Sequence, residues 1–224
     1  MTGCGTPCID IHSHGGGTGF TIHCAAPDQL DSVLERYPRV SVGLHPWSIG
    51  TVNPEAQIGR IERLADNPAV WAIGECGLDK LIATPLQDQE PLFRRQIEIA
   101  EGVGKPLIVH CVRAHEELLR LLKQTRPTGP VIVHGYNNRP AIGARLLDQG
   151  LLLSFGKALL APDSPARKVL AACPPDRFFL ETDDSGLPIE AIYRAAAECR
   201  GMSEEALGAQ LWENLRNTFP ARSL

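Results

Sequence analysis

The sequence predicts an α/β fold, a TIM-like (β/α) barrel that is trimmed or distorted between its first two strands. Short apolar runs of strand length recur along the chain, and stretches with helical periodicity separate most of them. Several runs are apolar throughout, which is typical of strands covered on both faces. Metal-binding side chains stand at or directly after the ends of five runs, and in a barrel the C-terminal strand ends form the rim that carries the active site.

Eight segments are expected to form the strands: Cys8–His12, Phe20–Cys24, Val40–His45, Val70–Glu75, Leu107–Cys111, Val131–His134, Leu151–Phe155 and Phe178–Thr182. Eight are expected to be helices: Asp28–Tyr37, Pro54–Asn67, Leu86–Val103, Ala114–Gln124, Pro140–Gln149, Ser164–Ala172, Pro188–Cys199 and Glu204–Thr218. The last helix has the clearest start, because Ser203 is a favoured N-cap residue and two glutamates occupy the first turn.

The connection between the first two strands departs from the pattern. GGGTG, five residues between His14 and Phe20, leaves no room for a helix, and a parallel neighbour normally needs about a dozen residues. We therefore expect Phe20–Cys24 either to pair antiparallel with the first strand or to be a short edge segment. No long linker, repeat or low-complexity tract interrupts the chain, so the sequence predicts one domain over residues 1–224.

Composition and charge limit the functions that are compatible with the sequence. A net charge of −4 and a pI near 6.0 argue against a broad basic surface that would bind duplex DNA by charge alone. Seven cysteines without a CxxC pair indicate free thiols in a reducing compartment. No export signal and no apolar run of ~20 residues is visible, so we expect a cytoplasmic protein without a membrane partner. An obligate protein partner is not evident either.

The first candidate metal ligands are His12 and His14. Residues two apart in a strand project from the same face, so both imidazoles can chelate one ion, and Asp10 shares their direction if the strand persists that far. Two histidines in a polar loop are the plainer interpretation of this motif alone, and the further ligands downstream make a metal site the stronger hypothesis. Asp10 is expected either to orient a ligand or to be structural.

The other candidate ligands follow later strands. Glu75 ends an apolar run, where a carboxylate is costly to bury unless it is paired or coordinated. His110 and His134 end the similar runs PLIVH and PVIVH. This repetition argues against the interpretation that both are only structural histidines of the core. After FFLET, an aspartate can touch a metal and accept a proton from bound water, but the pattern does not choose between Asp183 and Asp184.

Five further residues are candidates for contacts with a substrate. Arg113, Lys157 and Arg139 lie in loops after strands and can bind phosphate, although each can equally be a solvated surface cation. His45, in GLHPW, can hydrogen-bond a substrate or simply cap the turn that begins at Pro46. Trp47 can stack on a base or cover the barrel rim.

An ordered set of motifs resembles the TatD family of metal-dependent hydrolases. DIHSH, GLHPW, GECGLD, PLIVHC, VIVHGY and LETDD occur in the order and context of that family. QDQEPLFRRQIEIAEGVGKPLIVH looks like its Q-x-x-x-F-x-x-Q helix before a histidine strand, and WENLRNTF looks like its terminal helix. The similarity extends from Cys8 to Phe219, and as an ordered set the motifs are highly specific.

The resemblance implies a barrel of the amidohydrolase type with two divalent ions, magnesium, manganese or zinc. By position, His12 and His14 would bind the first ion with Asp183 beside it, His110 and His134 would bind the second, and Glu75 would bridge the two. Asp183 would also take the proton from water. Family members are nucleases that act on DNA ends, so the resemblance implies hydrolysis of phosphodiester bonds in single-stranded or end-frayed DNA.

Two other functions are also compatible with the sequence. The same ions would support a hydrolase of a small ester, amide or phosphotriester, which the acidic pI fits equally well. A non-catalytic metal-binding barrel is the third hypothesis, and the presence of all six ligands argues against it.

Three departures from the family pattern indicate a short, divergent subgroup. GGGTG replaces the helix between the first two strands, and Val112 stands where many members have an arginine, with Arg113 one position later. The segments HGYNN and ETDDSGL differ from the usual H-C-F-S-G and E-T-D-x-P-Y-L. The expected metal ligands survive all three changes, whereas the residues expected to face the substrate do not.

Overall fold

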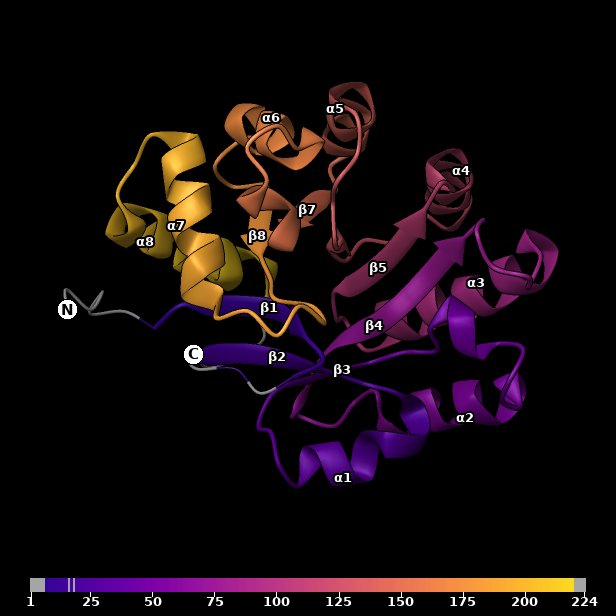
Figure 1. Cartoon of the computed structure of the whole chain (residues 1–224). Helices are drawn as coiled ribbons and strands as arrows, with labels where there is room; N and C mark the ends of the chain where they lie inside the picture. Colours follow the sequence, from indigo (N-terminus) through magenta and orange to yellow (C-terminus); the bar gives the residue numbers. More distant parts are fainter. Residues whose placement is uncertain (1–6, 16, 18, 220–224) are drawn as a thin grey trace. The chain divides into compact units, whose positions relative to one another are not determined.

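A computed structural model describes residues 7–15, 17 and 19–219. Its chain divides into two compact units, Met1–Ile22 with His134–Leu224, called unit 1, and His23–Val133, called unit 2. Figure 1 gives the succession of helices and strands. The prediction of one domain over residues 1–224 stays a prediction.

Unit 2 is built from parallel strands with helices between them. Consecutive strands from β2 to β6 pair in parallel. The strands are β2 (Phe20–Ala25, which spans the division between the units), β3 (Val40–Val42), β4 (Val70–Asp79), β5 (Leu107–Val112) and β6 (Val131–Val133). The helices are η1 (Pro27–Gln29), α1 (Leu30–Leu34), η2 (Pro46–Ser48), α2 (Pro54–Leu64), α3 (Leu86–Gly102) and α4 (His115–Thr125).

Unit 1 contains the two ends of the described chain. Strand β7 pairs in parallel with β8, and a parallel bridge between Ser13 and Asp183 joins the end of β1 to the segment after β8. The elements are β1 (Ile9–Ser13), α5 (Pro140–Asp148), β7 (Leu152–Phe155), η3 (Lys157–Leu160), α6 (Pro165–Ala172), β8 (Phe178–Leu180), α7 (Ile189–Arg200) and α8 (Glu204–Thr218). Buried Asn214 of α8 donates to the carbonyls of Pro175 and Phe178 and so fixes this helix to the start of β8.

All the predicted strands and helices are present, and the fold class is the predicted TIM-like (β/α) barrel. Several element boundaries differ from the prediction. Strand β3 ends at Val42 instead of His45, because a side chain of α3 binds both backbone polar groups of Leu44. Strand β4 continues to Asp79, beyond the predicted end at Glu75. The first helix is shorter than predicted and begins with a 3₁₀ turn.

The antiparallel alternative for the second strand is wrong. The Phe20 amide donates to the Cys8 carbonyl at 3.0 Å, so the starts of β1 and β2 are joined, and β2 runs parallel to β3. A five-residue strand such as β1 is only about 17 Å long. Six extended residues can reach about 20 Å, so a short connection can return the chain without a helix. The described residues of this connection, 14, 15, 17 and 19, are not helical, as predicted.

Within the described chain, Cys76, Cys111, Cys173 and Cys199 are free thiols. This agrees with the prediction from their spacing. Among the described helices, none combines the length and the apolar composition needed to cross a membrane.

Candidate metal centre

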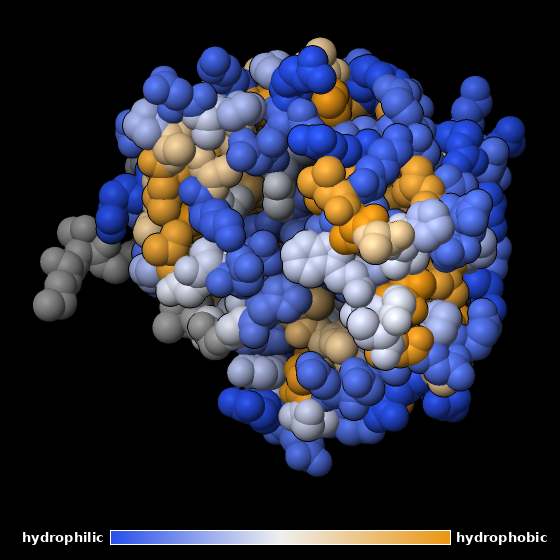
Figure 2. All heavy atoms as spheres, turned by 45° about the vertical axis from the view of Figure 1, so that its right-hand side comes forward, coloured by the Kyte–Doolittle hydropathy of each residue, from blue (hydrophilic) through white to orange (hydrophobic). Residues whose placement is uncertain are grey.

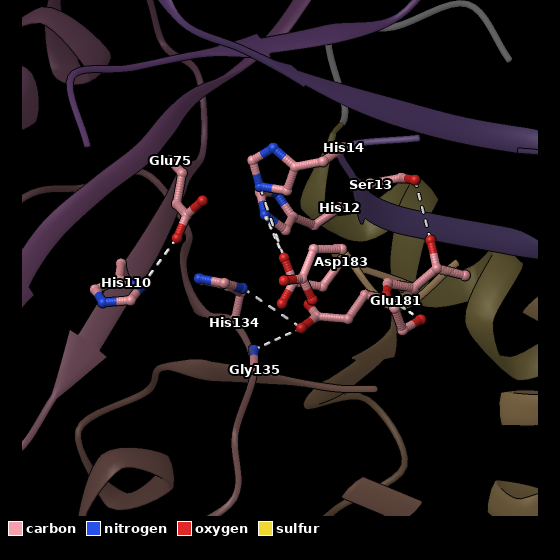
Figure 3. A network of polar contacts seen from close by, with 12 residues as sticks. His12, Ser13, His14, Glu75, His110, His134, Gly135, Glu181 and Asp183 are labelled. Atoms are coloured by element: carbon pink, nitrogen blue, oxygen red, sulfur yellow. Dashed lines mark hydrogen bonds and ion pairs between the residues drawn. The ribbon is translucent and has the colours of Figure 1, made fainter. Parts of the chain in front are cut away.

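In unit 1 the candidate ligands gather around Asp183. The Asp183 Oδ1 atom lies 3.7 Å from His12 Nε2 and 3.6 Å from His14 Nε2, and Figure 3 shows both imidazoles directed at this carboxylate. Ligand atoms of His12, His134 and Asp183 all lie within 4.8 Å of one another. Two imidazoles and a carboxylate at this spacing can share one divalent ion.

A buried hydrogen-bond network positions Asp183. Its amide donates to the His12 carbonyl at 3.0 Å, and its φ of 53° turns the chain into the left-handed region. The preceding residue, Thr182, donates from its amide (3.0 Å) and its hydroxyl (2.6 Å) to the Asp10 carboxylate. Burial raises the pKa of Asp10 to about 7, against the opposing hydrogen bonds from Thr182. Asp10 therefore anchors the segment that carries Asp183.

Asp184 has a different environment from Asp183. Its carboxylate lies 2.8 Å from Lys157 Nζ, and both side chains are exposed. The hydrogen bond with Lys157 lowers the pKa of Asp184 and raises the pKa of Lys157. The structure therefore groups Asp183 with the histidines and ties Asp184 to a predicted phosphate contact.

Glu181 is a site residue that the sequence reasoning missed. It is fully buried, and its Oε1 accepts a hydrogen bond from the Gly135 amide at 2.6 Å and lies 3.4 Å from His134 Nδ1. Burial favours a raised pKa for Glu181, but the attraction of His134 and His12 outweighs it and leaves the pKa below its usual value. A carboxylate next to one ring nitrogen orients a histidine and leaves the other nitrogen for a metal. Its position directly after the buried FFL strand was the available signal.

In unit 2 the candidate ligands gather around Glu75. Its Oε1 lies 2.9 Å from His110 Nδ1 and 3.0 Å from His45 Nε2, and the carboxylate is almost fully buried. Figure 3 shows His110 directed at Glu75. Ligand atoms of these three residues also lie within 4.8 Å of one another.

Asp79 is the second carboxylate that the sequence reasoning missed. Its Oδ2 lies 3.2 Å from His110 Nε2 and accepts a hydrogen bond from Trp47 Nε1 at 2.8 Å. Burial favours a raised pKa for Asp79, but hydrogen bonds from Trp47, the Leu81 amide and His110 outweigh it and lower the pKa. In the tautomer in which His110 donates its Nε2–H to Asp79 in a hydrogen bond, the Nδ1 lone pair faces Glu75 and can bind a metal.

His45 differs from the other imidazoles. Its Nδ1 accepts a hydrogen bond from the Trp47 amide at 3.1 Å. A neutral imidazole with one accepting nitrogen carries its proton on the other, which here is the Nε2 that faces Glu75. This tautomer makes His45 a hydrogen-bond donor at the site, a role distinct from metal coordination.

Helix α3 and two glycines support the unit 2 site. Gln89 exchanges hydrogen bonds with the backbone of Asp79, as its Oε1 accepts from the amide and its Nε2 donates to the carbonyl, both at 2.8 Å. A Cβ atom on Gly43 would lie 2.5 Å from the Glu75 carbonyl, and one on Gly77 would lie 2.0 Å from the His110 carbonyl. The backbones around both ligands therefore approach more closely than any side chain allows.

The family follows from comparison with known proteins. The family model for TatD related DNase matches residues 13–220. The chain belongs to the TatD family. It is 32% identical over 218 residues to a protein of Erwinia billingiae named 3′-5′ ssDNA/RNA exonuclease TatD, covering 85% of this chain and 82% of that protein.

Further TatD proteins are similar over most of their length. A protein of Klebsiella pneumoniae with the same name is 34% identical, with 80% of this chain and 76% of that one covered. A protein of Mycobacterium tuberculosis named uncharacterized metal-dependent hydrolase TatD is 28% identical, with 84% and 74% covered. The resemblance inferred from the motifs is confirmed, and with it the predicted class of metal-dependent hydrolases.

Solved structures agree on the fold. The crystal structure of YjjV, a TatD homologue from Escherichia coli, superposes with a TM-score of 0.83 over 95% of this chain and 98% of that chain, at 24% identity. A phosphotriesterase homology protein from the same species, with phosphate in its active site, has a TM-score of 0.66 over 96% and 99% at 17% identity. These likenesses concern the fold alone.

Within unit 1 of this TatD chain, His134 stands with His12 and Asp183. The pairing of His134 with His110 that the resemblance implies stays a prediction. The donors in both groups are imidazole nitrogens and carboxylate oxygens, which suit zinc or manganese and, through the carboxylates, magnesium. The residues present therefore fit a divalent ion of the kind that a metal-dependent hydrolase requires, which is how the Mycobacterium tuberculosis relative is named.

The remaining predicted substrate contacts lie outside these groups. Arg113 is exposed directly after β5 and has a φ of 53°. Arg139 is exposed at the N-cap of α5, and its carbonyl accepts a hydrogen bond from the Tyr136 hydroxyl. Trp47 has 63% of its surface exposed despite its bond to Asp79.

Proposed function

We propose that this protein is a metal-dependent phosphodiester hydrolase that removes nucleotides from the 3′ end of single-stranded DNA or RNA. Two groups of candidate ligands carry this proposal. Within each group the ligand atoms lie within 4.8 Å of one another, and a carboxylate orients one histidine. The relatives named 3′-5′ ssDNA/RNA exonuclease supply the substrate and the direction of attack.

The proposal assigns one divalent ion to each group. In unit 1, His12, His14, His134 and Asp183 would hold magnesium, manganese or zinc, and in unit 2 Glu75 and His110 would do so. A bound ion of this kind lowers the pKa of water and neutralises charge that develops on phosphate oxygens. Glu75 is the catalytic carboxylate of unit 2, where it also accepts a hydrogen bond from the Nε2–H of His45.

The protein residues then have defined roles in hydrolysis. The Asp183 carboxylate accepts the proton of the attacking water, since it is part-exposed and faces two imidazoles. His45 donates its Nε2–H to Glu75 in this structure, because the Trp47 amide holds the proton on that nitrogen, and would donate it to a phosphate oxygen once an ion occupies the Glu75 carboxylate. Arg113, Arg139 and Lys157 contact phosphates beyond the reacting one.

A digestion experiment tests the proposal. Single-stranded DNA with a 5′ label is incubated with the protein and magnesium, manganese or zinc. A descending ladder of labelled products is expected, and none is expected with a chelator. Immediate release of a labelled mononucleotide would instead indicate attack from the 5′ end.

Matched variants separate the roles of the residues. Asp183→Asn is expected to abolish turnover and to leave most of the bound metal, measured by mass spectrometry. Asp176→Asn is the control, because this exposed carboxylate forms an ion pair with its neighbour Arg177 and belongs to neither group of candidate ligands. Near-normal turnover of Asp183→Asn would exclude its role as the base.

The two other hypotheses have distinct outcomes in the same experiment. Turnover of small esters or phosphotriesters without any cleavage of oligonucleotides would identify a small-molecule hydrolase, which the net charge of −4 also fits. Protein purified without chelator that contains no metal and cleaves neither substrate would support a non-catalytic barrel.

A further inference from the structure

Trp47 is an exposed aromatic side chain with a fixed orientation. Of its surface, 63% is exposed, yet its Nε1 donates to Asp79 Oδ2 at 2.8 Å and its amide donates to His45 Nδ1 at 3.1 Å. The polar edge of the indole is therefore satisfied within the protein, and the aromatic surface is left to the solvent. An aromatic side chain that is held in place before binding loses less conformational entropy when a ligand stacks on it.

Asp79 orients more than the indole. The Asp79 Oδ1 atom accepts a hydrogen bond from the Leu81 amide at 2.7 Å, and Leu81 is itself 61% exposed. In the described chain the large exposed apolar side chains are Trp47, Leu81 and Leu160, and Asp79 accepts hydrogen bonds from the indole of the first and from the backbone amide of the second. Figure 2 shows that on one face hydrophobic residues are scattered among hydrophilic ones.

The indole lies next to two imidazoles of the unit 2 site. Its ring centroid is 5.1 Å from that of His45 and 6.0 Å from that of His110, both in edge-to-face geometry. The same Asp79 oxygen contacts Trp47 Nε1 and His110 Nε2. An exposed aromatic surface and a candidate metal ligand are thus fixed by one atom.

A nucleobase is the ligand that matches this arrangement. A base is a flat aromatic group, and the sugar links it to the phosphodiester next to it. A base stacked on Trp47 therefore brings a phosphodiester to the side of Glu75 and His110. Stacking is insensitive to base identity, as an exonuclease that removes successive nucleotides requires.

We propose that Trp47 and Leu81 form a stacking ledge for the terminal base of the single-stranded substrate, and that Asp79 is a positioning residue that fixes the indole relative to His110. This inference rests on the proposed function, since it names the part of the substrate that the same site recognises. Gln89 supports the ledge indirectly, because it fixes the backbone of Asp79 on both sides.

The test compares two oligonucleotides that have the same phosphodiester backbone. One ends in ordinary nucleotides at its 3′ end, and the other ends in two abasic residues. For the wild type, KM is expected to be lower for the base-bearing end. Trp47→Ala is expected to raise that KM about tenfold to a hundredfold and to leave KM for the abasic end unchanged.

Two controls make the comparison specific. Leu160→Ala removes another exposed apolar side chain and is expected to change neither KM value. Trp47→Phe keeps an aromatic ring without the hydrogen bond to Asp79, and its KM for the base-bearing end is expected to lie between those of wild type and Trp47→Ala. Equal KM changes for both oligonucleotides in Trp47→Ala would overturn the ledge.

A binding measurement gives a readout that is independent of turnover. Oligothymidylate added to metal-free wild type is expected to quench tryptophan fluorescence, and the quenching is expected to disappear in Trp47→Phe, although two other tryptophans remain. Unchanged quenching in Trp47→Phe would also overturn the ledge. This measurement serves if Trp47→Ala does not fold.

A double-mutant cycle tests the role of Asp79. The quantity compared is the KM for the abasic end divided by the KM for the base-bearing end. Asp79→Ala alone and Trp47→Ala alone are each expected to reduce this ratio, and the double variant is expected to reduce it no further, because both act through the indole. Additive reductions would remove the positioning role of Asp79. Absence of cleavage of both oligonucleotides by the wild type would instead refute the proposed function.

Discussion

The side chain of Gln96 hydrogen-bonds both backbone polar groups of Leu44. Its Oε1 accepts from the Leu44 amide at 2.7 Å, and its Nε2 donates to the Leu44 carbonyl at 3.2 Å. Leu44 directly precedes His45, so a residue of α3 sets the chain path that delivers His45 to Glu75. Gln89, two helical turns earlier, does the same for Asp79. One face of a helix thus fixes two loops of the unit 2 site.

Replacement of Gln96 by leucine is expected to reduce stability and activity together. The change removes both hydrogen bonds and leaves buried backbone groups of Leu44 unsatisfied, which costs about 1–3 kcal/mol for each group. Urea unfolding measures the free energy of unfolding, and kcat is expected to fall because His45 is displaced. Gln124→Ala, which removes only surface contacts with Arg94 and Arg120, is the control. An unchanged kcat in Gln96→Leu would separate the two effects.

Asp184 is expected to restrain the binding of nucleic acid through its pair with Lys157. In Asp184→Asn the cation is released for phosphate, so KM for an oligonucleotide is expected to fall by up to about fivefold at low salt. The gain should diminish as salt rises, since surface charges are screened. A salt series of KM values for the variant, the wild type and Lys157→Ala measures this. A KM that does not fall in Asp184→Asn would remove Lys157 from the phosphate contacts.

Glu181→Gln is expected to weaken metal binding in unit 1. Glutamine keeps an oxygen for the Gly135 amide but loses the negative charge beside His134. Loss of such a partner typically costs tenfold to a hundredfold in metal affinity. Titration with a fluorescent zinc chelator measures the affinity, and Glu213→Gln, an exposed carboxylate paired with Arg216, is the control. Equal zinc affinity in the two variants would contradict the role of Glu181.

The sequence predicted the elements of the fold and proposed candidate ligands, but it did not predict the side chains that support those candidates. Apolar runs and helical periodicity mark strands and helices locally, and a histidine or aspartate after a strand marks the strand end. Glu181 and Asp79 stand in equally visible motifs, but which imidazole each carboxylate contacts depends on residues far away in the chain. The tautomer of His45 depends on a single backbone amide that no periodicity encodes.

The short connection between the first two strands led to the wrong antiparallel alternative for the second strand. The requirement of about a dozen residues for a parallel crossover assumes a helix between the strands, whereas β1 has only five residues and six extended residues can return along it. Whether the second strand could run parallel therefore depended on the length of β1, which the apolar pattern predicted only to within a residue or two.

Gly77→Ala is expected to be among the most damaging single substitutions in unit 2. A Cβ atom would lie 2.0 Å from the His110 carbonyl, and the φ of 141° is strained for any residue with a side chain. Overpacking and backbone strain together are expected to cost about 2–5 kcal/mol. At about 2–4 °C per kcal/mol for a chain of this size, the melting temperature should fall by roughly 5–15 °C.

The matched control for this substitution is Gly102→Ala. Gly102 ends α3, and a Cβ atom there would meet nothing within 4 Å, so its melting temperature should stay the same or rise slightly. Because Gly77 pairs in register with His110, the Gly77→Ala variant should also lose zinc affinity before it unfolds. A variant with the melting temperature and zinc affinity of wild type would mean that β4 and β5 can separate locally, and the close approach of their backbones would then not be needed to place His110.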